Sequence, residues 1–168
     1  MSFFFMRYPL LMKDRAVESW AFPMSLEVQD IMVSKVVTGR ASISVKEAVD
    51  TMNEHGIGCL VVVEKESPVG IVTERDLLKR VLGESKDPRK INVQEIMSKP
   101  LIVGKPDMVI EEVIKLMIDK KIKKLPIVEN GKLLGLVTLT DIVSFQPQLI
   151  HVVKQLTHPH EWEKIEEK

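Results

Sequence analysis

Two short segments of this sequence carry residue types that could bind a sugar and an anion. The segments GIVTERD (70–76) and GLVTLTD (135–141) each place threonine and aspartate three positions apart, between a predicted strand and a predicted helix. A hydroxyl and the free N–H groups of a helix N-terminus suit a phosphate, and a carboxylate can accept hydrogen bonds from both hydroxyls of a ribose. The same spacing also forms a capping box, in which threonine and aspartate satisfy the helix's own N–H groups. Either segment taken alone favours the cap.

The two segments belong to two copies of one longer unit. Ile31-Met32 recurs as Ile96-Met97, an offset of 65 residues (97 − 32), and the offset holds without a gap as far as Asp76 and Asp141. So long a register is typical of an internal duplication. We therefore predict repeats over about residues 26–82 and 91–146, a polar linker over 83–90, and extensions over 1–25 and 147–168.

Each repeat is predicted to follow the order β-α-β-β-α. A short extended segment (36–38 or 101–103) precedes an amphipathic helix, whose apolar residues recur at i, i+3, i+4 and i+7 from Val45 and from Ile110. Two strands follow, over 59–63 and 69–73 in the first copy and over 125–128 and 134–138 in the second. The closing helix of the first copy carries Leu77, Leu78, Val81 and Leu82. The expected fold is α+β, with the two repeats packed sheet against sheet by approximate two-fold symmetry, which creates two equivalent clefts.

The composition narrows the possible functions. Of the 168 residues, 45% are hydrophobic and 29% charged, as in a soluble globular protein, and no apolar run approaches the length of a membrane-spanning helix. The 24 basic and 24 acidic residues cancel, and aromatic residues make up only 5%, which argues against binding to nucleic acid or to a membrane surface. The one cysteine, Cys59, cannot form an internal disulfide, so we expect a cytoplasmic protein. The sequence has neither a P-loop nor a nucleophile elbow, and we expect no enzyme activity.

The two extensions lie outside the repeats. Residues 1–25, with Phe3-Phe4-Phe5, are either an upstream extension without a role in the fold or an arm that docks or caps a dimer. Residues 158–161 contain two histidines and a glutamate, but no distant partner stands at a recognised spacing, so we expect no metal site. Beyond Pro147, an amphipathic helix that covers exposed core or a partner chain is predicted from Leu149, Val152, Val153 and Leu156.

The duplicated unit resembles a tandem pair of cystathionine β-synthase (CBS) domains, also called a Bateman module, over about residues 26–146. The resemblance rests on the Ile-Met lead-in, the apolar strand before a turn, and G-h-h-T-x-x-D at the start of the last helix. Modules of this kind bind AMP, ADP, ATP or S-adenosylmethionine in the clefts between paired domains. The resemblance implies that Asp76 and Asp141 hold ribose hydroxyls and that Thr73 and Thr138 lie near ribose or phosphate. Backbone contacts to adenine and the rest of the pocket are implied for Val36, Val37, Thr38, Gly58, Cys59, Leu60, Leu101, Ile102, Val103, Lys124, Leu125 and Pro126.

The two copies differ in charge. Residues 115–124 contain five lysines and one aspartate, a local charge of +4. Basic residues before the Leu-Pro of this strand meet phosphate in similar proteins, so Lys123 and Lys124 are candidate phosphate contacts. Arg75 could supply the corresponding charge in the first cleft, whereas Thr140 cannot do so in the second. We therefore expect the two sites to be inequivalent.

The sequence favours a non-catalytic regulatory module that binds an adenosine-containing effector and signals to a partner in trans, as a homodimer. It requires no cofactor beyond that effector. One alternative is an assembly module whose clefts are vestigial. Another is a protein that binds adenine-rich nucleic acid through the lysine stretch, which the zero net charge disfavours.

Overall fold

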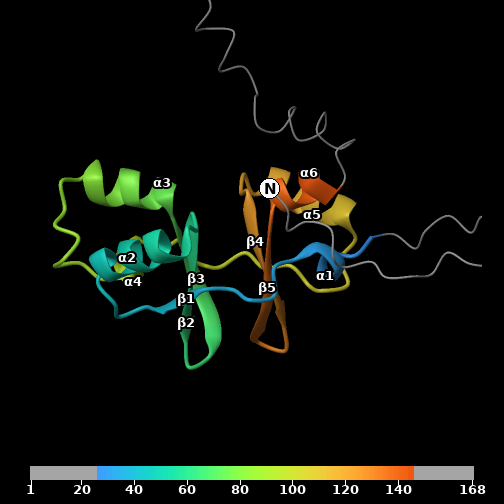
Figure 1. The fold of residues 1–168 in the computed structure, drawn as a ribbon, viewed down its shortest axis with the longest axis horizontal. Helices are drawn as coiled ribbons and strands as arrows, with labels where there is room; N and C mark the ends of the chain where they lie inside the picture. Colours follow the sequence, from blue (N-terminus) through green and yellow to red (C-terminus); the bar gives the residue numbers. More distant parts are fainter. Residues whose placement is uncertain (1–25, 146–168) are drawn as a thin grey trace, which may run out of the picture.

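The computed structural model describes residues 26–145 (Figure 1). The extension predicted over 1–25, the helix predicted beyond Pro147 and the histidines of 158–160 lie outside these residues. Two small sheets meet at the centre of the described part, with helices on the outer sides (Figure 1). The fold confirms the prediction of two α+β repeats packed sheet to sheet with approximate two-fold symmetry.

The first repeat contains a three-stranded sheet in the order β1-β2-β3. Strand β1 is parallel to β2, and β2 pairs antiparallel with β3, with Cys59 opposite Thr73. Helix α2 begins at a Ser44/Glu47 capping box and ends at Gly56, whose φ of 61° suits glycine. The elements are α1 (Val28–Ile31), β1 (Thr38–Arg40), α2 (Val45–His55), β2 (Cys59–Glu64), β3 (Ser67–Thr73), α3 (Glu74–Leu77) and the π-helical turn η1 (Leu78–Leu82).

The second repeat has the same plan with one strand fewer. Strands β4 and β5 pair antiparallel, with Lys124 opposite Thr138, and Gly104 adds a single parallel bridge to Ile127 where the first repeat has β1. The elements are α4 (Val93–Ile96), α5 (Ile110–Asp119), β4 (Lys124–Glu129), β5 (Lys132–Thr138) and α6 (Leu139–Phe145).

The first strand of each repeat differs from the prediction. In the first copy the strand begins at Thr38 rather than at Val36, and in the second copy residues 101–103 form no strand. The pairing centres on Gly39 and Gly104, because a glycine lets the chain approach the neighbouring strand. A Cβ at Gly39 would lie 2.5 Å from the Leu60 side chain, and one at Gly104 would lie 2.9 Å from that of Leu125.

The closing helix of the first repeat also differs from a regular helix. Four α-helical residues are followed by the π-helical turn η1. Val81 is buried, whereas the Leu78 and Leu82 residues are 61% and 72% exposed. In an unbroken amphipathic helix the apolar residues would all face the core. In this segment they do not.

The two repeats exchange their lead-in helices, α1 and α4. Val93, Ile96 and Met97 from the start of the second repeat complete the hydrophobic core of the first. Val28 is buried in the core of the second repeat, and Ile31 and Met32 pack against it. Antiparallel bridges extend the exchange, since Val33 pairs with Leu136 and Ser98 pairs with Ile71. Each core thus depends on residues from both copies.

The repeated methionines fit against the repeated glycines of the GIVTERD and GLVTLTD segments. A Cβ at Gly70 would lie 2.5 Å from the Met97 sulfur, and a Cβ at Gly135 would overlap Met32 in the same way. The methionine of each Ile-Met pair therefore packs against the glycine that opens the segment of the other repeat.

Candidate ligand-binding cleft

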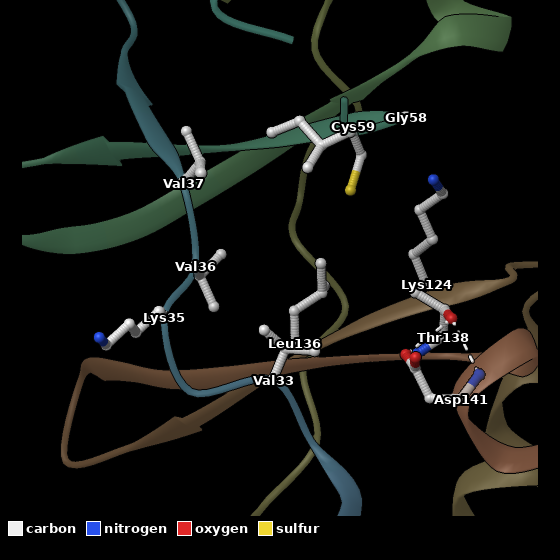
Figure 2. A pocket seen from close by; sticks show the side chains of 11 residues that line it. Val33, Lys35, Val36, Val37, Gly58, Cys59, Lys124, Leu136, Thr138 and Asp141 are labelled. Atoms are coloured by element: carbon white, nitrogen blue, oxygen red, sulfur yellow. Dashed lines mark hydrogen bonds between the residues drawn. The ribbon is translucent and has the colours of Figure 1, made fainter. Parts of the chain in front are cut away.

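A cleft of about 210 Å³ lies between the two repeats (Figure 2). The first repeat supplies the segment that follows α1 and the start of β2. The second repeat supplies the start of β4, the second half of β5 and the start of α6. The lining residues are Val33, Lys35, Val36, Val37, Ile57, Gly58, Cys59, Lys124, Leu136, Thr138 and Asp141.

Thr138 and Asp141 form the capping box of α6 at one end of the cleft. The Thr138 N–H and hydroxyl donate to Asp141 Oδ2 at 2.8 and 2.7 Å, and the Asp141 N–H donates to Thr138 Oγ1 at 3.2 Å. Asp141 Oδ1 accepts no hydrogen bond from residues 26–145. Capping and ligand binding are therefore compatible, because the cap uses one carboxylate oxygen and leaves the other for a donor in the cleft.

The wall between the two polar ends is apolar. Val33, Val36, Val37, Ile57 and Leu136 line it, and Val33 is 50% exposed. Figure 2 shows Val36 and Leu136 pointing into the space between Val37 and Asp141. An apolar wall beside a few placed polar groups is the usual composition of a small-molecule site.

Two lysines line the cleft, Lys35 and Lys124, and Lys124 is the one on the same side as Asp141 (Figure 2). This residue pairs with Thr138 across β4 and β5, and its side chain extends toward Gly58 (Figure 2). A Cβ at Gly58 would lie 2.9 Å from Lys124 Nζ and 2.7 Å from Glu74 Oε2. Gly58 therefore leaves room for an ammonium and a carboxylate to approach from opposite repeats.

The Cys59 thiol beside this pair is buried. Desolvation raises the pKa of Cys59, the positive charge of Lys124 lowers it to a smaller extent, and the negative charge of Glu74 raises it. Cys59 is therefore a buried thiol and not an activated nucleophile.

Asp76, the counterpart of Asp141, forms the same capping box with Thr73 at the start of α3. Its Oδ1, however, has two further neighbours. The Ser98 hydroxyl donates to Oδ1 at 3.4 Å, and Arg80 Nη2 lies 3.5 Å from it. The two aspartates share a motif but differ in what surrounds it.

The cleft brings together seven of the residues predicted for the site: Val36, Val37, Gly58, Cys59, Lys124, Thr138 and Asp141. Eleven others do not line it. Thr38 lies in β1, Thr73 and Asp76 lie at the start of α3, and Arg75 and Lys123 are exposed. Leu101, Ile102 and Val103 precede Gly104, and Leu60, Leu125 and Pro126 are buried in β2 and β4.

Sequence reasoning missed Val33, Lys35, Ile57 and Leu136 in the cleft lining. Leu136 stands inside the GLVTLTD segment and could have been found by its alternation with Val137, which is buried. Val33 reaches the cleft only because the lead-in segments are exchanged, which no pattern in one repeat indicates.

A protein-family model described as the CBS domain matches residues 28–83 and 93–147. The chain belongs to the CBS domain family. An uncharacterized protein of Methanopyrus kandleri is 42% identical over 133 residues, which cover 78% of this chain and 68% of that protein. A hexameric CBS-CP12 protein from bloom-forming cyanobacteria has a similar structure, with a TM-score of 0.69 and 35% identity over 76% of this chain and 71% of that one.

A second solved structure bears on the ligand. It is the CBS domain pair of the protein MJ0100 in complex with 5′-methylthioadenosine and S-adenosyl-L-methionine. It has a TM-score of 0.68 and 28% identity, over 74% of this chain and 98% of that one.

Within residues 26–145, the helices are too short or too polar to cross a membrane.

Proposed function

We propose that this CBS domain pair is a non-catalytic regulatory module that binds an adenosine-containing ligand in the cleft at Asp141. The observation that carries the proposal is the Asp141 carboxylate, whose Oδ2 is held by the α6 cap while Oδ1 accepts no bond from residues 26–145. An acceptor held in place beside an apolar wall suits the two hydroxyls of a ribose and the base attached to it. The complex of the related MJ0100 pair with two adenosyl compounds supports this class of ligand.

The cleft offers a separate contact for each part of such a ligand. The apolar wall of Val33, Val36 and Leu136 would receive the adenine, and Asp141 would accept from the ribose. Lys124 would face the 5′ substituent, where AMP, ADP and ATP carry phosphate. In S-adenosylmethionine the 5′ substituent carries a carboxylate, which Lys124 could also meet.

Ligand binding would change the relative orientation of the two repeats, because each repeat supplies part of the cleft. A ligand shifts an equilibrium between two arrangements only by binding one of them more tightly. The arrangement that the ligand favours would then be read by a partner protein in trans.

Thermal denaturation with AMP, ADP, ATP, S-adenosylmethionine and NAD tests the proposal. At one hundred times its dissociation constant, a ligand stabilises the folded state by roughly 2.7 kcal/mol, a rise in Tm of about 5–10 °C for a chain of this size. We expect Asp141→Asn to reduce the shift sharply. The matched control is Asp119→Asn, at the exposed end of α5, which keeps the full shift. If none of the five compounds raises the Tm, the proposal is wrong.

We also propose that the chain forms a homodimer, a role that would remain if the clefts were vestigial. The exposed Leu78 and Leu82 on η1 favour this, since two adjacent leucines on one helical turn form an apolar patch. The hexameric CBS-CP12 relative is an example of self-association within the family. Light scattering should report a dimer that Leu78→Asp/Leu82→Asp converts to a monomer. A monomeric wild type would contradict this proposal and leave the ligand site untouched.

A further inference from the structure

The carboxylate of Asp76 is already bonded within the protein. Its Oδ2 accepts from the Thr73 N–H at 2.9 Å and the Thr73 hydroxyl at 2.6 Å. Its Oδ1 is approached by Ser98 Oγ at 3.4 Å and by Arg80 Nη2 at 3.5 Å. The side chain of Asp76 is only 13% exposed. Both oxygens therefore face protein donors, and one of these donors carries a full positive charge.

Arg80 is held in place from a second direction. Its Nη1 donates to the main-chain oxygen of Ile96 at 2.5 Å, and its Nη2 donates to Ser98 Oγ at 3.4 Å. Ile96 belongs to α4, which is buried in the core of the first repeat. The guanidinium thus joins α3–η1 to the lead-in helix of the second repeat and lies beside Asp76 Oδ1.

The second repeat has no donor at either of these positions. At the 65-residue offset, Arg80 corresponds to Phe145, and Ser98 corresponds to Val33. Neither side chain can donate a hydrogen bond. Val33 instead lines the apolar wall of the described cleft, and Asp141 Oδ1 accepts no bond from residues 26–145. Two substitutions between the copies account for the difference between the two aspartates.

We infer that Arg80, with Ser98, occupies the second carboxylate oxygen of Asp76, so that each chain binds a single adenosyl ligand and binds it at Asp141. This inference rests on the proposed function. A ribose at Asp76 would have to displace a charge-assisted contact and leave the guanidinium without its carboxylate, whereas a ribose at Asp141 meets an acceptor with no such competitor. Arg80 is therefore a specificity-determining residue that acts by closing one of two similar sites.

Exchange of the two differing residues between the repeats tests the inference. Arg80→Phe/Ser98→Val gives the first repeat the residues of the second, and Val33→Ser/Phe145→Arg does the reverse. Equilibrium dialysis with radiolabelled AMP and, separately, with radiolabelled S-adenosylmethionine counts the ligands bound per chain. We expect one for the wild type, two for the first variant and none for the second. Adding Asp76→Asn to the first variant should remove only the new site.

Each result separates the inference from the proposed function. Two ligands per wild-type chain, or one ligand in the opened variant, would overturn the inference while the proposed function stands. No binding of AMP or S-adenosylmethionine to the wild type overturns the inference, and the proposed function fails with it only if ADP, ATP and NAD also leave the Tm unchanged. Binding at Asp141 is an internal check that the opened variant folds. Where that check fails, Arg80→Gln, which keeps a donor for Ile96 but removes the charge, takes its place under the same expectation of a second site.

Discussion

Asp76 and Asp141 stand in the same motif, at the same offset and in the same capping box, and yet their second oxygens have different surroundings. Asp76 Oδ1 lies near a hydroxyl and a guanidinium. Asp141 lies at the end of an apolar cleft. The residues that make this difference, Arg80 and Ser98 against Phe145 and Val33, all lie outside the motif. A duplicated site can thus change its role through neighbours while its motif stays intact.

The largest expected difference in stability between equivalent substitutions in the two repeats concerns the glycine-methionine contacts. Gly70→Ala places a methyl group against Met97, which is buried, and should lower the free energy of unfolding by about 2–3 kcal/mol. Gly135→Ala should cost less, because its partner Met32 is only partly buried and can shift. Urea denaturation measures both. Adding Met97→Ala to Gly70→Ala should recover part of the loss, and a Gly70→Ala protein of wild-type stability would contradict the contact.

Removing the aspartate of each capping box should lower the free energy of unfolding by different amounts, because only Asp76 also contacts Arg80. In the absence of ligand, Asp141→Ala removes a helix cap, at a cost of about 1 kcal/mol. Asp76→Ala removes the same cap together with the partner of Arg80, so we expect it to cost about 0.5–1 kcal/mol more. Equal losses in urea denaturation would show that the Arg80 contact contributes nothing to stability. Arg80→Gln measured alongside separates the contact from the cap.

The two hairpin turns invite a similar comparison. Lys65 and Glu66 have φ of 47° and 68°, a region that side chains disfavour, whereas the equivalent turn uses Asn130 and Gly131 at 51° and 75°. Glu66→Gly should therefore stabilise the protein by about 1 kcal/mol, and Gly131→Glu should destabilise it by a similar amount. Glu64→Gly, at the last residue of β2, is the control and should destabilise. A fall in Tm for Glu66→Gly would contradict this account of the turn.

The smallest expected effect concerns the charges on either side of Cys59. Burial raises the pKa of this thiol, so little thiolate is present at neutral pH and alkylation should be slow, rising with pH. Lys124→Met removes a charge that lowers the pKa, and it should shift the rate profile of iodoacetamide labelling to higher pH. Glu74→Gln should shift the profile to lower pH. Mass spectrometry measures the labelling of the single cysteine. Shifts of the opposite sign would contradict the assigned effects of Lys124 and Glu74 on the pKa of Cys59.

Regular features of the fold could be predicted from the sequence because they depend on local patterns. Apolar spacing located α2 and α5, and the 65-residue offset located the hairpins in both copies. The first strand was placed too early, since Val36 and Val37 have strand-forming side chains that in fact line the cleft. The exchange of lead-in helices could not be predicted, because two repeats with the same apolar pattern look alike whether each helix packs on its own copy or on the other.

The candidate site was predictable only in part, for the same reason. Thr138 and Asp141 could be selected from their spacing, either as a cap or as a ligand contact. Both roles fit the geometry, because the cap uses only one of the two carboxylate oxygens of Asp141. The contact between Arg80 and Ile96 spans 16 residues and exists only after α4 has packed on the first repeat. No pattern within one motif indicates such a contact.

The exchange of α1 and α4 has a consequence for how the chain is made. During synthesis, the core of the first repeat lacks Val93, Ile96 and Met97 until these residues have left the ribosome, after β3 and the linker are complete. Val28, the first buried residue of the described chain, waits for the second repeat to be made before it is covered. The first core can therefore close once Met97 has emerged, before β4 and β5 are made, whereas the second core needs a helix from the start of the chain. The second repeat must then fold onto a first repeat that is already present.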